Sequence, residues 1–236
     1  QDRDTFRSTS AFSYSGTYAS GLQLTVGVGS SFYHRVNLHA SRSSDNSRNR
    51  DLNLDINTRY ERLASSITHT FGVSARRTIY DFDLQVNPRD TDRRSNIRRG
   101  WSMRHAVQRR FMSTLQVSSS YAYKADDFGR FIVEDNAQIV EEDNSDHTVS
   151  CGVLYRPNRV FYLATNYTYR LDRQWDHDYD NFREFRSLVI RNKHENLSVT
   201  LDYKPTRDST LNFRGSRSRQ LSGTFDSFNI GYVRTI

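Results

Sequence analysis

The stretch LYRPNRVFYLATNYTYRLDRQW, residues 154–175, contains the pattern that decides the fold. It begins with a polar turn around Pro157 and continues as a run in which apolar and polar residues alternate. One set of alternate positions is mostly apolar or aromatic: Phe161, Leu163, Thr165, Tyr167, Tyr169 and Leu171. The other set is smaller or polar: Ala164, Asn166, Thr168 and Arg170. A period of two residues predicts a β-strand with one apolar face and one polar face.

The same alternation recurs along the whole chain, and helical periodicity is almost absent. Eleven segments show it, at residues 6–14, 22–38, 52–60, 67–75, 97–107, 115–123, 149–155, 161–171, 197–203, 211–213 and 228–236. Short connections are expected at residues 18–21, 61–66, 108–110, 156–159 and 204–208. Long polar connections are expected near residues 41–51, 77–96, 124–147, 171–195 and 217–226. This spacing predicts an antiparallel up-and-down meander with short turns at one end of the sheet and long loops at the other.

Composition limits the kinds of fold and function. Only 35% of the 236 residues are hydrophobic, so a deep core between two layers would be poorly supplied. The aromatic content of 13% argues against disorder, and the single cysteine excludes an intrachain disulfide. The net charge of +7 comes mostly from arginines that are mixed with aspartates along the chain. We therefore expect no nucleic-acid partner.

A soluble β-sandwich or β-propeller would also show alternating strands. Three features favour a membrane barrel instead. The expected strands have roughly 10–15 residues, compared with ~5–6 in soluble proteins. The long connections all lie at one end, and aromatic residues gather near strand ends, as in the girdles of membrane barrels. The chain, residues 1–236, is thus predicted to be one all-β domain. It would be an antiparallel up-and-down transmembrane β-barrel, or part of a larger one, with about 11–12 long strands.

The pattern resembles that of Gram-negative outer-membrane β-barrel proteins. The last nine residues, FNIGYVRTI, place Phe228, Ile230, Tyr232 and Ile236 at alternate positions, similar to the terminal-strand signal of that class. Ile236 departs from the aromatic residue usual at the end of that signal, and Arg234 interrupts the apolar row. The turns YRPNR and YKPTR also resemble those of barrels linked to polysaccharide export and of barrels that sheathe multihaem cytochromes. The resemblance implies location in the bacterial outer membrane and contact with its lipid and lipopolysaccharide.

In such a barrel the two faces of each strand meet different surroundings. Toward lipid we expect an aromatic belt: Tyr121, Tyr123, Tyr155, Tyr167, Tyr169, Tyr203 and Tyr232. Toward the lumen we expect seven arginines: Arg35, Arg59, Arg76, Arg98, Arg104, Arg170 and Arg214. A lumen lined in this way would favour anions. In the alternative, the lumen charges pair with one another or with a plug.

Strand parity bears on how such a barrel closes. Short turns lie in the periplasm in this class. If Ile236 also ends there, eleven strands place Gln1 outside the cell. An even-stranded barrel with both termini in the periplasm then needs at least one more strand. A strand hidden in this sequence, an additional N-terminal portion or another chain would supply it.

No motif predicts enzymatic chemistry or a cofactor, because GxSxG, HExxH, P-loop and GxGxxG patterns are all absent from the sequence. The stretch DRQWDHDYDNFREF, residues 172–185, offers oxygen ligands for Ca²⁺ but lacks the glycine and distal glutamate of an EF-hand. Its candidate ligands are Asp172, Asp176, His177, Asp178 and Asp180. An acidic surface loop is the simpler interpretation, and residues 133–146 have the same character. We expect no metal site.

Three functional hypotheses follow. The first is an outer-membrane channel or conduit for small solutes or a polymer. The second is a structural barrel that scaffolds or sheathes a partner, such as a secretion component or a multihaem cytochrome. The third, a barrel enzyme, has the least support. Ion conduction by the isolated chain would separate the first hypothesis from the second.

Overall fold

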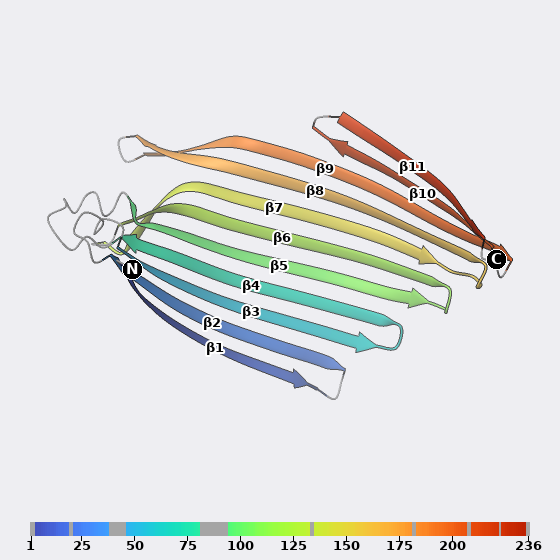
Figure 1. Cartoon of the computed structure of the whole chain (residues 1–236), viewed down its shortest axis with the longest axis horizontal. Helices are drawn as coiled ribbons and strands as arrows, with labels where there is room; N and C mark the ends of the chain where they lie inside the picture. Colours follow the sequence, from blue (N-terminus) through green and yellow to red (C-terminus); the bar gives the residue numbers. More distant parts are fainter. Residues whose placement is uncertain are drawn as a thin grey trace.

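The computed structural model describes residues 3–18, 21–37, 46–80, 94–132, 135–180, 183–206, 209–221 and 223–234. Eleven strands account for nearly all of them (Figure 1). Their bounds are β1 (Arg3–Thr17), β2 (Leu22–Asn37), β3 (Ser47–Arg62), β4 (Ser65–Tyr80), β5 (Asn96–Phe111), β6 (Leu115–Ile132), β7 (Ala137–Tyr155), β8 (Phe161–Asp180), β9 (Arg183–Thr206), β10 (Ser209–Gln220) and β11 (Gly223–Arg234). Nowhere in the described part of the chain is there a helix long and apolar enough to cross a membrane.

The strands form one antiparallel sheet in which each strand pairs with its neighbours in the sequence, from β1 to β11 (Figure 1). This order confirms the predicted up-and-down meander and its number of strands. It also rules out a two-layered sandwich and a propeller, because all eleven strands belong to a single sheet. The predicted polar turn around Pro157 is confirmed as well. There the Asn158 side-chain oxygen accepts hydrogen bonds from the backbone N–H groups of Val160 and Phe161, both at 2.9 Å.

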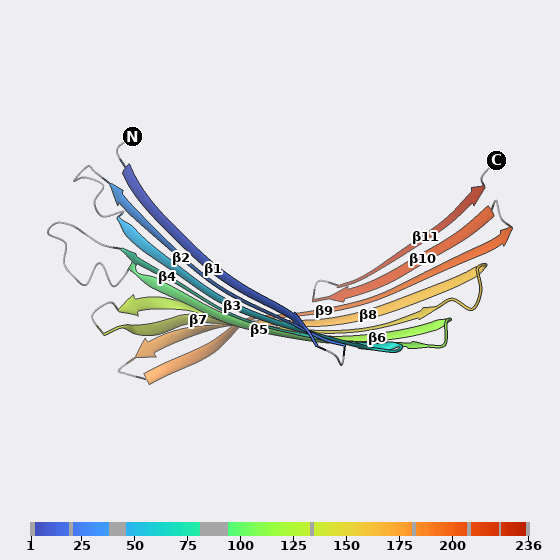
Figure 2. The ribbon, with the colours of Figure 1, turned by 90° about the horizontal axis from the view of Figure 1, so that it is seen from below.

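The sheet is open. Strands β1 and β11 are its two edges, and Figure 2 shows the curved sheet with these strands on opposite sides. Alternate strands of a meander run in the same direction, so β1 and β11 are parallel to each other. Apolar side chains on both edges are strongly exposed: Phe12 to 64% and Ile230 to 71%. An exposed apolar edge is rare in a soluble protein, because it recruits other chains.

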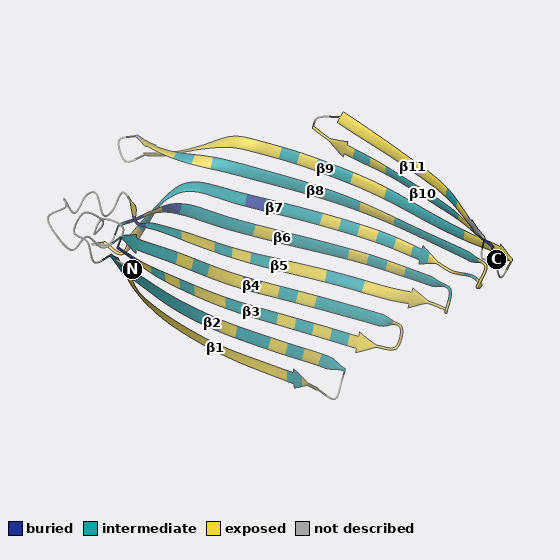
Figure 3. Cartoon of the chain, in the orientation of Figure 1, coloured by how far each residue is buried: buried dark blue, intermediate teal, exposed yellow. Residues whose placement is uncertain are grey.

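The described residues have almost no conventional core. Phe131 is their only buried hydrophobic side chain. Figure 3 shows that nearly all of the sheet is of intermediate or high exposure. The accessible surface is 16817 Å², whereas a compact folded chain of this mass exposes roughly 11,000 Å². A single layer cannot shield either of its faces from the surroundings. Its apolar face therefore needs lipid or another protein against it.

The pairing register sorts the side chains onto two faces, because directly opposed residues of adjacent strands point the same way. We name the faces by β9, where Leu197, Val199, Leu201 and Tyr203 mark the apolar face, and Asn196, Ser198, Thr200 and Asp202 mark the polar face. On the apolar face Leu201 lies opposite Leu163 and Phe213. On the polar face Ser198 lies opposite Asn166 and Ser216. The predicted alternation thus becomes two continuous surfaces across the sheet.

Three of the expected long connections are instead strand. Residues 124–147, 171–195 and 217–226 belong mostly to β6–β9 and to the β10–β11 hairpin. Their polar composition suggested loops, but cross-strand ion pairs stabilise the ladder beyond the apolar stripe. Examples are Arg130 with Glu141 at 2.6 Å and Arg217 with Asp226 at 2.7 Å. The other two expected connections are also partly strand, since residues 47–51 belong to β3 and residues 77–80 to β4. Residues 41–45 and 81–93, like Ile236, lie outside the described residues.

The expected turn at residues 108–110 was also placed wrongly, since β5 continues to Phe111 and the turn occupies residues 112–114. Two of the tight turns contain a non-glycine residue with positive φ, at Leu63 (52°) and Met112 (57°). Both side chains are almost fully exposed. They therefore make no packing contacts that would offset the backbone strain of a left-handed conformation.

Replacing Leu63 by glycine should stabilise the sheet. The left-handed backbone is strained for leucine but not for glycine. Relief of this strain should exceed the entropic cost of the extra freedom that glycine gives the unfolded chain, so the free energy of unfolding should rise by about 0.5–1 kcal/mol. Urea unfolding in detergent micelles measures this difference. Ala64→Gly at the neighbouring position, where φ is not positive, should not stabilise. Equal effects of the two substitutions would contradict the explanation.

Candidate functional site

The polar face is the first candidate surface, because it carries all seven arginines predicted from the sequence. The register places them on one face of six strands: Arg35 on β2, Arg59 on β3, Arg76 on β4, Arg98 and Arg104 on β5, Arg170 on β8 and Arg214 on β10. Their neighbours are mostly small and polar. Arg104 lies opposite Thr70 and Ala122, and Arg214 lies opposite Thr200 and Asn229. That this face lines a lumen stays a prediction.

Four of these seven arginines form ion pairs with carboxylates of the same face. The pairs are Arg59 with Glu61, Arg76 with Asp51, Arg98 with Asp126 and Arg170 with Asp146. The guanidinium groups remain about half exposed or more, so each pair contributes little stability. The pairs do cancel much of the positive charge. The sequence left open whether the arginines present free positive charge or pair with other charges. These four arginines pair with carboxylates of the same face.

The other three arginines form no ion pair with a described residue. The Arg35 guanidinium carbon lies 5.8 Å from the Tyr33 ring centroid, and its Nε is buried without a hydrogen-bond partner. Arg104 and Arg214 likewise have no carboxylate within ion-pair distance among the described residues. Beside Arg104 is a hollow of about 290 Å³ whose lining is rich in hydroxyl and amide groups, including Ser66, Thr68, Gln108, Ser118, Ser120, Ser150 and Asn166. A cation among hydroxyl donors is suited to a small anion or a hydroxylated solute.

The apolar face carries all seven tyrosines of the predicted belt. Tyr155, Tyr203 and Tyr232 lie close to the ends of their strands near the short turns, and the remaining four lie further along theirs. The sequence analysis missed the aromatic partners of the second group. The Trp101 and Tyr123 rings are tilted against each other with their centroids 4.7 Å apart, and His147 Nδ1 lies 3.0 Å from the Tyr121 hydroxyl. The sequence could have revealed these partners, because Trp101 in β5 and His147 in β7 occupy the same alternate positions as the apolar residues of their strands.

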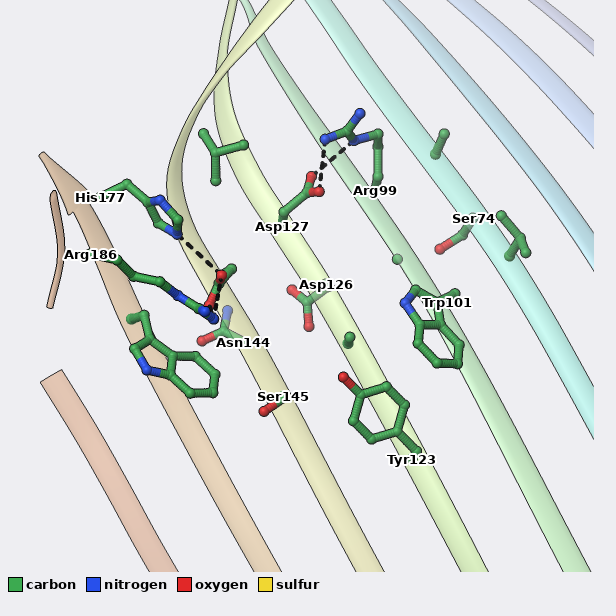
Figure 4. Close-up of a pocket in the computed structure, with 17 residues that line it drawn as sticks. Ser74, Arg99, Trp101, Tyr123, Asp126, Asp127, Asn144, Ser145, His177 and Arg186 are labelled. Atoms are coloured by element: carbon green, nitrogen blue, oxygen red, sulfur yellow. Dashed lines mark hydrogen bonds and ion pairs between the residues drawn. The ribbon is translucent and has the colours of Figure 1, made fainter. Parts of the chain in front are cut away.

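A pocket of about 550 Å³ opens on the apolar face over β4–β9, where the apolar stripe gives way to charged residues (Figure 4). Trp101 and Tyr123 form its wall on the side of the stripe. On the charged side, Arg99 donates two hydrogen bonds to Asp127, at 3.1 and 2.9 Å. Trp175 lines the pocket beneath the Arg186 guanidinium, which lies 4.2 Å from its ring centroid.

His177 is the centre of a cross-strand cluster at this pocket. Its side chain is only 7% exposed and contacts Asp143 at 3.1 Å through Nε2 and Glu184 through Nδ1. Arg186 donates to the same Asp143 carboxylate at 2.9 Å. At the tip of the hairpin, burial and the nearby Glu184 carboxylate raise the pKa of Tyr179. The cluster joins β7, β8 and β9 where they extend beyond the apolar stripe.

This arrangement bears on the acidic stretch that offered calcium ligands. Residues 172–180 are strand, so alternate side chains point to opposite faces. His177 lies on the apolar face, whereas Asp172, Asp176 and Asp178 have the opposite parity and lie on the polar face. The side chain of Asp180 is outside the described set. Within the described residues no group of three His, Cys, Asp or Glu side chains is placed to hold a metal ion.

Comparison with known proteins gives a fold but no family. No protein-family model matches the sequence, and no curated protein matches it significantly. Among solved structures, a variant of the ferric enterobactin receptor PfeA of Pseudomonas aeruginosa is similar, with a TM-score of 0.66 and 10% identity over 98% of this chain. The outer membrane transporter YddB of Escherichia coli has a TM-score of 0.65 and 7% identity over 97% of this chain. The siderophore receptor PirA of Pseudomonas aeruginosa has a TM-score of 0.58 and 14% identity over all of it.

The fold is that of an outer-membrane β-barrel wall. This confirms the predicted fold class and the resemblance on which it was based. The chain spans only 39%, 36% and 37% of the length of these three proteins, respectively.

Removing the Asp143 carboxylate should loosen the extended hairpin. In Asp143→Ala, His177 and Arg186 lose their shared acceptor, which should cost about 1 kcal/mol of local stability. Hydrogen exchange of the backbone in residues 172–190 would then be faster, and mass spectrometry measures it. The matched control is Asp178→Ala in the same hairpin, whose carboxylate, among the described residues, accepts a hydrogen bond from the backbone N–H of Tyr179 alone. Equal exchange in the two variants would contradict a role for the cluster.

Proposed function

We propose that this chain forms part of the wall of a transport barrel in the bacterial outer membrane, with the polar face lining the passage. The observation that carries the proposal is the division of a sheet without a core into one apolar and one polar surface. Val153, Leu197 and Tyr203 on the apolar face are each about two-fifths exposed in the isolated chain. Membrane barrels have this arrangement, with apolar residues toward lipid and polar residues inside.

The location is supported by the likeness to solved outer-membrane structures and by the predicted terminal-strand signal. The named neighbours are receptors and a transporter, which favours transport over catalysis as the role of this chain. Membrane lipid and lipopolysaccharide would then contact the apolar face.

Closure of the barrel requires further strands. Strands β1 and β11 run in the same direction and both are edges, and an edge cannot be left unpaired within a bilayer. An odd number of additional antiparallel strands would pair with both edges. The larger size of the similar structures is compatible with this requirement. If those strands belong to another protein, the two chains would share one barrel, as the strand parity of the sequence allows.

The solute that the polar face suits best is small, hydrophilic and anionic. Arg104 and Arg214 form no ion pair with a described residue, and the hollow beside Arg104 adds hydroxyl donors. Four of the other five predicted arginines on this face are paired with carboxylates, so the passage would be polar throughout and positive at a few points. Such a lining favours anions without holding them tightly.

Lipid-facing and lumen-facing positions should differ in their tolerance of charge. Val199→Arg places a cation in the middle of the apolar stripe on β9, at a cost of about 2–4 kcal/mol near the bilayer midplane. Ser198→Arg, one residue away on the polar face, should cost far less. Heat-modifiable gel mobility after refolding into liposomes measures insertion. Equal insertion of the two variants would refute the proposed orientation.

Charge reversal of Arg104 should change ion selectivity. With the protein in a planar bilayer, Arg104→Glu should lower the anion-to-cation permeability ratio roughly two- to fivefold, because an uncompensated cation in the passage becomes an anion. Arg109→Glu on the same strand is the control, since Arg109 lies on the apolar face opposite Ser65 and Val117. A closed but inserted protein would favour the scaffold role, and an unchanged ratio would exclude Arg104 from the passage.

A further inference from the structure

Two arginines oppose each other on the apolar face, where the register places Arg50 of β3 directly opposite Arg77 of β4. Directly opposed side chains are about 4.5–5.5 Å apart at Cβ, and like charges in that position are destabilising. Among the described residues Arg50 forms no ion pair. The Arg77 guanidinium carbon lies 5.0 Å from the Phe131 ring centroid and likewise has no carboxylate partner.

The opposite face of the same strands provides an internal comparison. There Arg76 of β4 lies directly opposite Arg98 of β5. Each of these arginines has its own carboxylate: Asp51 lies 2.6 Å from Arg76, and Asp126 lies 3.5 Å from Arg98. The sheet thus neutralises the Arg76–Arg98 pair internally and leaves Arg50 and Arg77 without a counter-charge from the described residues. Arg173 and Arg191, opposed on β8 and β9, also form no ion pair with a described residue, but only Arg50 and Arg77 share a hollow with further basic side chains.

The unneutralised pair lines a hollow of about 550 Å³. Its described lining is cationic and apolar, with no carboxylate: Ser30, Phe32, His34, Arg48, Arg50, Arg77 and Ile79. Guanidinium groups recognise phosphate through paired hydrogen bonds, and stacking on an aromatic ring leaves their N–H edge free to donate. The chemistry of the hollow is therefore that of a phosphate site.

The position of the hollow indicates which phosphate compound it would take. It lies at the end of the apolar stripe formed by Val26 and Val28 on β2, and by Leu54 and Leu52 on β3. The stripe remains open, with Val28 exposed to 46% and Leu52 to 44%. A ligand with a phosphate at one end and a hydrocarbon chain at the other fits both features. A free phosphate ion would use only the cationic end.

We propose that His34, Arg50 and Arg77 form a binding site for the phosphate group of a membrane lipid, whose acyl chain lies along the stripe of β2 and β3. The inference rests on the proposed orientation of the apolar face toward lipid. The headgroup phosphate supplies the negative charge that no described carboxylate gives to the opposed arginines. Basic pockets at membrane surfaces bind anionic headgroups in this way.

The test is lipid binding by the delipidated protein in micelles of neutral detergent, followed by native mass spectrometry. The probes are diphosphorylated lipid A, the same lipid without its phosphates, and inorganic phosphate. We expect the phosphorylated lipid to bind at least about tenfold more tightly than either of the others, since only it satisfies both the arginines and the apolar stripe. Equal affinity for inorganic phosphate would overturn the lipid assignment, and equal affinity for the dephosphorylated lipid would overturn the phosphate site.

The double variant Arg50→Gln/Arg77→Gln should bind the phosphorylated lipid at least about tenfold more weakly, because it lacks the charge-assisted hydrogen bonds of the two guanidinium groups. Arg76→Gln, one residue along β4 on the polar face, should retain full affinity. If the double variant does not fold, Arg77→Glu serves instead, because the new carboxylate pairs with Arg50, supports the sheet and removes the phosphate site. Retained affinity in a folded variant would overturn the proposal.

This measurement requires neither membrane insertion nor ion conduction. Failure of the lipid site can therefore be distinguished from failure of the proposed function. Loss of the phosphate preference with normal insertion would overturn only the site. Conversely, a protein that binds the lipid in micelles but tolerates Val199→Arg in liposomes would contradict the proposed orientation.

Discussion

A single layer of β-sheet has no interior, and the rest of this structure depends on that constraint. In a two-layered protein, the apolar face of each sheet is buried against another element. Here there is no second layer among the described residues, and Phe131 is the only buried hydrophobic side chain. Every strand must therefore satisfy two different surroundings at once. The alternation of apolar and polar residues over eleven strands is the direct result.

The same constraint explains how charge is distributed. On the polar face, arginines and carboxylates alternate with hydroxyl groups, and most of the predicted arginines find an acidic partner. On the apolar face, Arg99–Asp127 and the His177 cluster lie where the strands extend beyond the hydrophobic stripe. Arg50 and Arg77 also lie at the end of the stripe, but they form no ion pair with a described residue. Their shared hollow, which has no described carboxylate, makes them informative because it suits a ligand of opposite charge.

Much of the fold was predictable because alternation is a local property. Within a regular strand, a residue and its neighbour two positions along share a face, and the pairing departs from this only at the irregularities after Phe128 and Gln174. The parity of Tyr167 and Arg170 was therefore sufficient to assign them to opposite faces before any strand pairing was known. The polar segments 124–147 and 171–195 misled the sequence analysis, because charge suggested loops. In the sheet those charges are cross-strand partners, which single-strand patterns do not reveal.

The sequence by itself determined the two faces, the number of strands, and the residues that each face presents. Only the tertiary structure decided which residues of different strands meet, and that the sheet stays open with β1 and β11 parallel at its edges. The physical reason is register. Pairing between strands places residues distant in the sequence directly opposite each other, such as Asp143 and Trp175, and Arg50 and Arg77. A shift of two residues would preserve every face and change every such pair.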